Sequence, residues 1–138
     1  MDKSIIIKYF HTSVRIFTGL LLIIIAGSKF GLLPSAVKNE GLFTPEGWAF
    51  ISVIQTNGYL FPVIGIIFLL CGIALLINRY VALAALIIVP ITINFALFHL
   101  FLGFREFSVR ELFSYLPFVL NILVLYKHRE KFSILIKS

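Results

Sequence analysis

The chain has 138 residues, of which 60% are hydrophobic and 13% are charged, and its formal net charge is +6. Soluble domains carry about 25% charged residues, so this composition excludes an ordinary soluble domain and indicates an integral membrane protein. The length leaves no room for a separate soluble unit, and we expect a single transmembrane domain over residues 1–138. The positive charge does not indicate nucleic-acid binding, because basic side chains beside apolar segments act as topology signals and contact anionic lipids.

Four apolar segments follow one another along the chain, at about 11–29, 58–77, 81–103 and 108–126. A helix needs about 20 mostly apolar residues to cross a bilayer core, and about 17 are sufficient. The second and third segments meet this length directly, and the first and fourth meet it with their flanking residues. The predicted fold class is therefore all-α, an integral membrane four-helix bundle.

The first segment also has the features of a secretory signal. A basic start and an apolar run precede the small residues Ala26, Gly27 and Ser28, which are typical of a cleavage site. Removing this segment would leave three spans with the C-terminus on the same side. The distribution of charge therefore does not exclude this alternative.

A short helix is predicted in the connection between the first two spans. Thr44 is a favourable N-cap, Pro45 is suited to the first helical position, and Glu46 places an acid in the first turn. The apolar run that follows, up to Ile54, is too short to cross a bilayer. We therefore predict a short helix at the outer interface, with Trp48 near the level of the lipid headgroups.

Small residues predict where helices approach each other closely. Gly58, Gly65 and Gly72 recur every seven residues and so share one face of the second segment. Gly27 and Gly31 form a GxxxG pattern at the end of the first segment. Such patterns allow close helix–helix contact in membranes, and we interpret both as packing seams within the bundle.

The basic residues are distributed unevenly between the two sides that four spans define. A tight hairpin at Asn78 and Arg79 joins the second and third spans and lies on the more basic side. That side holds Lys3, Lys8, Arg15, Arg79, Lys127, Arg129, Lys131 and Lys137 against Asp2 and Glu130, a net charge of +6. The other side holds Lys29, Lys38, Arg105 and Arg110 against Glu40, Glu46, Glu106 and Glu111, a net charge of zero. The positive-inside rule then predicts an inner (plasma) membrane protein with both termini in the cytoplasm and with Arg15, Arg79, Lys127 and Arg129 as topology anchors.

Polar side chains at membrane depth are costly and mark candidate functional sites. Lys29, His99, Arg110 and Glu111 lie at the outer ends of their spans and are predicted to converge on one opening, while Asn94 lies near mid-depth. A histidine beside two cations and a carboxylate can bind an anion, or can hydrogen-bond a quinone and relay protons. The structural alternative is that the cations are ordinary interfacial anchors and that Asn94 joins two helices.

Several kinds of chemistry are poorly supported. The three histidines, His11, His99 and His128, include no pair four residues apart, so no metal site is predicted. Cys71 is the single cysteine, which excludes an internal disulfide and a CxxC relay. No phosphate-binding loop, dinucleotide fingerprint or nucleophile motif is present.

The order of several motifs resembles the DoxX family of small four-helix bacterial membrane proteins over nearly the whole chain. These motifs are Arg15-Ile16-Phe17-Thr18-Gly19, Gly27-Ser28-Lys29-Phe30, Gly58-Tyr59-Leu60-Phe61-Pro62, the segment from Gly72 to Arg79, Pro90-Ile91-Thr92-Ile93-Asn94-Phe95 and Phe98-His99-Leu100-Phe101-Leu102. The resemblance implies a four-span inner-membrane protein. Some members are linked to the membrane part of thiosulfate:quinone oxidoreductase, and others to redox-stress assemblies. The resemblance points to Arg15, Lys29, Asn94 and His99.

The leading hypothesis is a membrane subunit that binds a quinone or similar small ligand at its outer face and supports a partner oxidoreductase, without being an autonomous enzyme. A small transporter or permease-like bundle is an alternative, since Pro90 and Pro117 interrupt two spans and can permit rearrangement. A structural scaffold without catalysis is a third. The lipid bilayer is the partner common to all three.

Overall fold

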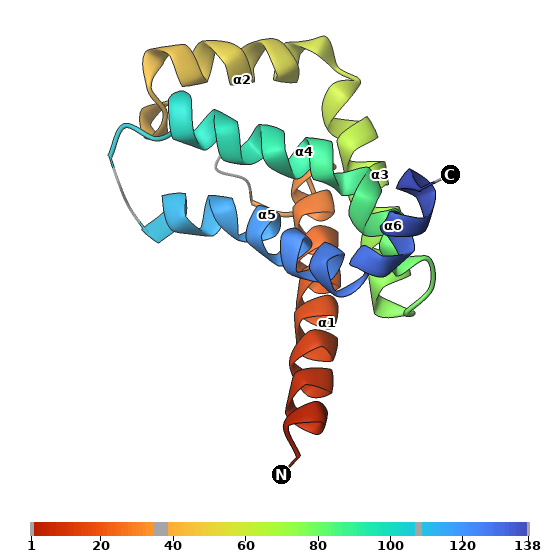
Figure 1. The fold of residues 1–138 in the computed structure, drawn as a ribbon. Helices are drawn as coiled ribbons and strands as arrows, with labels where there is room; N and C mark the ends of the chain where they lie inside the picture. The colour runs from red at the N-terminus through yellow and green to blue at the C-terminus, as the bar shows by residue number, and fades with distance from the viewer. Residues whose placement is uncertain (1, 35–38, 107–108, 138) are drawn as a thin grey trace.

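The computed structural model describes residues 2–34, 39–106 and 109–137, and every regular element in these ranges is a helix (Figure 1). The elements are α1 (Lys3–Lys29), the 3₁₀ turn η2 (Glu40–Leu42), α2 (Pro45–Asn57), α3 (Leu60–Leu76), α4 (Val81–Phe101), α5 (Val109–Lys127) and α6 (Arg129–Ile136). The predicted all-α fold is confirmed. Lys38 and the first residue of the predicted fourth span, 108, lie outside the described residues.

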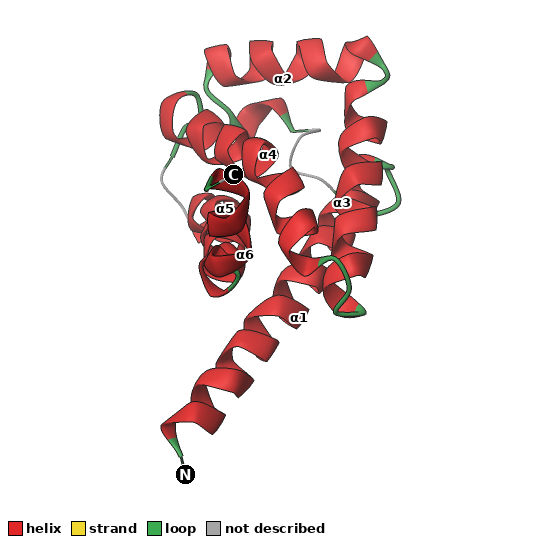
Figure 2. Ribbon diagram, turned by 45° about the vertical axis from the view of Figure 1, so that its right-hand side comes forward, coloured by secondary structure: helices red, strands yellow, loops and turns green. Residues whose placement is uncertain are grey.

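Within the described residues, three helices are long and apolar enough to cross a bilayer: α1, α4 and α5. Helix α3 has 17 residues and meets the same criterion only together with α2, from which it is bent by 86°. Helix α1 begins at Lys3, well before the predicted start at residue 11, and its first turns project from the body of the molecule (Figures 1 and 2). The prediction of membrane-spanning helices is therefore confirmed in part: α1, α4 and α5 each meet the criterion alone, and α3 does not.

The four long helices pack as two pairs, α1 with α3 and α4 with α5. In Figure 1, α4 and α5 run across the direction of α1 and α3, so the pairs do not share one axis as the predicted bundle implied. Ridges and grooves on helix surfaces permit such steep crossings as well as nearly parallel ones. Leu22, Phe68 and Ile88 come from three different helices and are fully buried where the pairs meet.

Glycine brings α1 and α3 together. A Cβ at Gly72 would lie 2.9 Å from Gly19 O, and one at Gly65 would lie 3.0 Å from the ring of Phe30. The seam predicted at Gly65 and Gly72 therefore is a packing surface, because any side chain there would collide with α1. Arg15 secures one end of this contact, since its Nη1 donates to the carbonyls of Leu75 and Leu76 at the end of α3.

Two of the predicted seam positions are wrong. Gly58 ends α2 in the left-handed region, with φ 82°, and no atom lies near its missing Cβ. Gly31 has φ 77°, lies beyond the end of α1 and is also open. Only glycine adopts such backbone angles at low cost, so these residues serve chain reversal instead of helix packing.

The α3–α4 hairpin is confirmed, and it defines one end of the molecule. Only residues 77–80 separate the two helices, and Asn78 and Tyr80 have positive φ values of 58° and 55°. We call this the hairpin end, and it includes α6. The opposite end, formed by residues 39–58 and 102–106, is called the loop end.

Buried polar groups are mostly satisfied within their own helices. The hydroxyls of Thr18 and Thr92 donate to Val14 O and Ile88 O at 2.6 and 3.0 Å. Asn121 is fully buried and joins two helices, because its Nδ2 donates to Ala85 O at 3.1 Å. This bond joins α5 to α4, as interhelical hydrogen bonds do in membrane proteins.

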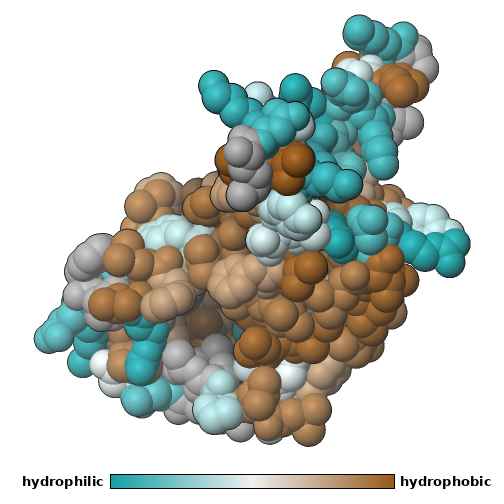
Figure 3. All heavy atoms as spheres, turned by 90° about the horizontal axis from the view of Figure 1, so that it is seen from below, coloured by the Kyte–Doolittle hydropathy of each residue, from teal (hydrophilic) through white to brown (hydrophobic). Residues whose placement is uncertain are grey.

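Large apolar side chains cover much of the surface. Leu70, Leu100 and Phe101 are examples, at 62%, 64% and 76% exposure. In the view of Figure 3 the body is mostly hydrophobic, and hydrophilic residues gather on the parts that project. Soluble monomers rarely expose apolar surface of this extent, so the surface is suited to contact with lipid.

Candidate functional site

The candidate site is held by two loops that are fastened together at the loop end. Thr44 is the N-cap of α2 and accepts from Gly47 N at 3.1 Å, as predicted. Its hydroxyl also donates to Leu102 O, and its backbone N–H donates to Gly103 O at 3.2 Å. Arg105 completes the attachment, with Nε donating to Phe43 O at 2.7 Å.

Two glycines make this close approach possible. A Cβ at Gly47 would lie 2.3 Å from Leu102 O, and one at Gly103 would lie 2.3 Å from His99 O. Both positions are buried. The start of α2 can therefore contact the end of α4 because Gly47 has no side chain, and Gly103 allows the chain to turn closely against the last turn of α4.

An aromatic cluster fills the space beneath the fastened loops. Phe43 is 2% exposed, and its ring lies 5.1 Å from Phe104, 6.1 Å from Phe98 and 6.4 Å from Trp48. Phe43 and Trp48 occupy the positions of a hydrophobic staple, one before the N-cap and one in the first turn after it. The staple sets the direction in which the chain enters α2.

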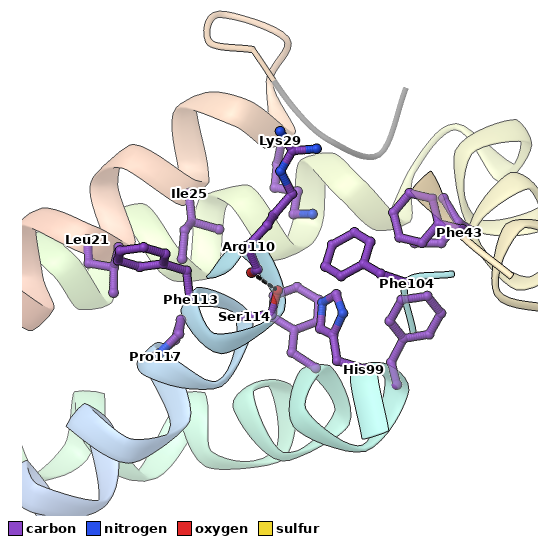
Figure 4. Close-up of a pocket in the computed structure, with 13 residues that line it drawn as sticks. Leu21, Ile25, Lys29, Phe43, His99, Phe104, Arg110, Phe113, Ser114 and Pro117 are labelled. Carbon is purple, nitrogen blue, oxygen red and sulfur yellow. Dashed lines mark hydrogen bonds between the residues drawn. The ribbon is translucent and has the colours of Figure 1, made fainter. Parts of the chain in front are cut away.

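Beside this cluster lies a cavity of about 310 Å³ with mainly apolar walls (Figure 4). Three helices line the cavity, each mainly with residues three or four positions apart. The lining residues are Leu21, Ile25 and Lys29 from α1; Phe95, Phe98 and His99 from α4; Arg110, Phe113, Ser114 and Pro117 from α5; and Phe43, Ile51 and Phe104 from the loop end.

The structure brings three of the predicted site residues to this cavity: Lys29, His99 and Arg110. In Figure 4, Lys29 and Arg110 lie on one side of the cavity and His99 on the other. The polar groups thus face a common space from α1, α4 and α5. A molecule in the cavity would meet hydrogen-bond donors at both sides and apolar contacts between them.

His99 is enclosed by rings and has an unused nitrogen. Its Nδ1 is buried without a hydrogen-bond partner among the described residues. Its ring lies 5.0 Å from Phe104, 5.1 Å from Phe98 and 6.4 Å from Tyr115. Buried polar atoms are nearly always hydrogen-bonded, so the unpaired nitrogen marks His99 as a candidate binding residue.

Lys29 is held by aromatic faces instead of a carboxylate. Its Nζ lies 4.4 Å from the ring centre of Phe61 and 5.1 Å from that of Phe95. Cation–π contacts orient an ammonium group without neutralising it. Among the described lining residues no acid accompanies Lys29 and Arg110, so this side of the cavity favours a negative or electron-rich oxygen.

Glu111 and Asn94 are not among the residues described as lining the cavity. One residue along a helix turns the side-chain direction by about 100°, so Glu111 cannot share the face of Arg110. Asn94 is exposed, and its Nδ2 donates to Pro90 O at 2.8 Å in its own helix. It borders a separate hollow with Phe50 and Leu97.

The predicted topology anchors all lie away from the cavity. Arg15 binds carbonyls at the end of α3, and Arg79 lies over the ring of Tyr80 at 5.7 Å. Lys127 ends α5, and the guanidinium of Arg129 donates to Tyr126 O at 3.0 Å. Arg15 thus has a packing role that the charge pattern alone does not show.

The remaining wall residues could have been found from spacing. Leu21 and Ile25 precede Lys29 by eight and four residues, and so lie on its face of α1. Phe113, Ser114 and Pro117 follow Arg110 at three, four and seven residues, the same rule on α5. Phe104 and Phe43 have no such signal, because loop contacts bring them in.

The arrangement can bind a small molecule with an apolar body and oxygen atoms at its ends. No group of three or more potential metal ligands occurs within the described ranges. Comparisons with protein-family models, curated proteins and solved structures found no match for this chain. The fold and surface define the chain as an α-helical membrane protein.

Proposed function

We propose that this protein is an integral membrane subunit that binds a quinone, or a similar flat molecule with carbonyl oxygens, in the cavity between α1, α4 and α5. The observation that carries the proposal is the cavity itself, with His99 opposite Lys29 and Arg110 across apolar walls. Sites for small molecules are typically apolar cavities of about 300–1,000 Å³ with few, well-placed polar groups.

The donor set suits a quinone. Carbonyl oxygens at the two ends of the ring accept hydrogen bonds, which Lys29 and Arg110 can donate at one end and His99 at the other. The aromatic rings beside His99 offer faces on which a flat ring can stack. A quinone bound here supplies two-electron redox chemistry to a partner, and this chain contributes the binding.

The resemblance to the DoxX family favours the same role. On that basis we propose a partner oxidoreductase, since the chain itself has no cysteine pair or metal cluster in the described residues. The partner would exchange electrons with the bound quinone at the loop end.

We also propose that four helices cross an inner membrane, with both termini in the cytoplasm and α2 lying along the outer interface. Helix α3 has 17 residues and no charged side chain, enough to cross a bilayer core. The 86° bend turns α2 away from the direction of α3. The more basic hairpin end then faces the cytoplasm.

Cysteine accessibility tests this topology. Cys71 is buried and is replaced by alanine, and single cysteines are placed by Gly41→Cys at the loop end and Lys131→Cys at the hairpin end. With an impermeant maleimide on intact cells, we expect labelling of the Gly41→Cys variant only. Labelling of the Lys131→Cys variant from outside would mean that α3 does not cross.

Quinone binding is tested by mass spectrometry on the protein purified from native membranes in mild detergent, scoring bound quinone and co-purifying subunits together. We expect close to one quinone per chain, lost in His99→Ala and reduced about tenfold or more in Lys29→Met, because each variant removes a donor. Asn94→Ala and His128→Ala are matched controls outside the cavity and should retain quinone.

The outcomes separate the remaining possibilities. Purified protein without quinone, and with no binding of added short-chain quinone, contradicts the proposal and leaves transport or scaffolding to be tested by solute flux in proteoliposomes. Quinone bound equally by wild type and His99→Ala contradicts the assignment of the site.

A further inference from the structure

A second cavity, of about 510 Å³, lies at the hairpin end, away from the candidate quinone site. It is formed by the α3–α4 connection, the first turn of α4 and the junction of α5 with α6, which lie next to each other in Figure 1. Its basic side chains are Lys127, His128 and Lys131, and Asn78 adds an amide. We call this the basic cavity.

The three basic side chains come from the junction of α5 with α6. Lys127 and Lys131 are four residues apart, on either side of the α5–α6 junction, and both are exposed. His128 is anchored between them, because its Nδ1 lies 2.9 Å from Val124 O. No acid is among the described residues that line the basic cavity, although Glu130 lies in the same helix as Lys131.

Backbone donors complete the cavity. Tyr80 is the N-cap of α4 but makes no side-chain cap, and residues 81–83 line the basic cavity. The first N–H groups of a helix have no partner inside it, and the 21-residue α4 adds the positive end of its dipole. The start of α4 and the two lysines therefore border one space.

The depth of the basic cavity in the membrane favours a lipid headgroup as the source of the anion. Tyr80 and Tyr126 border this end and are 71% and 63% exposed. Exposed tyrosines of membrane proteins gather at the depth of the lipid headgroups, where the phosphates also lie. This argument holds whichever leaflet the hairpin end meets.

We propose that the basic cavity binds a phosphate group, supplied by the headgroup of an anionic phospholipid. The phosphate oxygens accept from Lys127, Lys131 and the first turn of α4. The site is independent of the candidate quinone site, since it shares no lining residue with it.

The test compares two double variants that remove equal charge from the same end. Lys127→Ala with Lys131→Ala removes both ammonium groups of the basic cavity, and Arg129→Ala with Lys137→Ala removes two cations that do not line it. Binding of phosphatidylglycerol to the purified full chain is measured by native mass spectrometry, with phosphatidylcholine as the neutral lipid. Inorganic phosphate is added in a separate arm.

We expect the Lys127/Lys131 variant to bind phosphatidylglycerol about tenfold more weakly or worse, and the Arg129/Lys137 variant to stay within about twofold of wild type. Lys127→Arg with Lys131→Arg should restore binding, which guards against misfolding as the cause. If inorganic phosphate displaces the lipid at millimolar concentration, the site stands and free phosphate is its ligand.

Three results would overturn the proposal. One is equal weakening in both double variants, which means that only general charge matters. Another is unchanged lipid binding in the Lys127/Lys131 variant. The third is equal binding of phosphatidylcholine and phosphatidylglycerol by the wild type.

Discussion

The loop end and the hairpin end both present cations, yet they hold them in different surroundings. At the loop end, Lys29 rests on aromatic faces at the edge of an apolar cavity. At the hairpin end, Lys127 and Lys131 border an open cavity lined by polar groups and the start of a helix. The same type of side chain therefore lies in apolar surroundings at one end and in polar surroundings at the other, and the two proposed ligands differ accordingly.

The ends also differ in how they are held together. Loop-to-helix hydrogen bonds and buried aromatic rings close the loop end. Toward the hairpin end, close backbone contact at Gly19 and Gly72 and the Arg15 guanidinium join α1 to α3. The single tryptophan, Trp48, lies at the loop end, so its fluorescence reports on that end alone while circular dichroism reports on all the helices.

The largest effect on stability and on quinone binding is expected from Gly103→Ala. The new Cβ would lie 2.3 Å from His99 O, so the end of α4 and the loop that follows it must shift. Overpacking of this kind costs about 1–3 kcal/mol, and we expect loss of quinone binding together with red-shifted Trp48 emission. Gly41→Ala, in an exposed turn, is the control, and an unchanged Gly103→Ala protein would contradict the closure of this end.

Gly72→Ala should weaken the contact between α1 and α3 toward the hairpin end. Its Cβ would meet Ile23 Cγ1 at 2.8 Å and Gly19 O at 2.9 Å, so α1 and α3 must move apart. We expect the free energy of unfolding in mixed micelles to fall by about 1–3 kcal/mol, measured by circular dichroism. Native Trp48 emission should stay as in the wild type, and a shift of that emission would show that the ends are coupled.

Arg15→Met tests the charged contact at the end of α3. A hydrogen bond from a charged donor contributes about 1.5–3 kcal/mol, and here the Leu75 and Leu76 carbonyls would lose it. We expect a lower free energy of unfolding by roughly that amount. Arg79→Met removes equal charge from a side chain that contacts only the Tyr80 ring in the described residues, and it should lie within about 0.5 kcal/mol of wild type. Equal losses of unfolding free energy in both variants would mean that Arg15 does not stabilise the fold through this contact and serves only as a topology signal.

The smallest effect on stability is expected for Asn121→Leu. Asn121 donates one hydrogen bond to Ala85 O, but its Oδ1 is buried without a partner in the described residues. Removing a bond and an unsatisfied acceptor together is nearly neutral, so stability should change by less than about 1 kcal/mol. A loss of several kcal/mol in micelle unfolding would show that Oδ1 has a partner, such as a buried water.

Local patterns in the sequence predicted many of the structural elements. Hydropathy predicted helices and lipid contact because apolar length and the cost of unpaired backbone groups are properties of single segments. The cap at Thr44 and the α3–α4 hairpin were predicted because each depends on a few adjacent residues. The glycine pattern predicted contact at Gly65 and Gly72, but it could not show that Gly58 ends a helix instead.

Only the tertiary structure decided what the polar residues face. Lys29, His99 and Arg110 lie on three helices, and their convergence depends on how those helices cross. Glu111, predicted at the same depth, is not among the residues that line the cavity, because a shared depth in the membrane does not imply a shared helix face. Sequence by itself determined that the long apolar segments are helical, a matter of local composition, but it predicted neither the early start of α1 nor α6. The crossing of the helix pairs and the closure of the loops through Phe43, Gly47 and Gly103 depend on long-range packing, which no local pattern encodes.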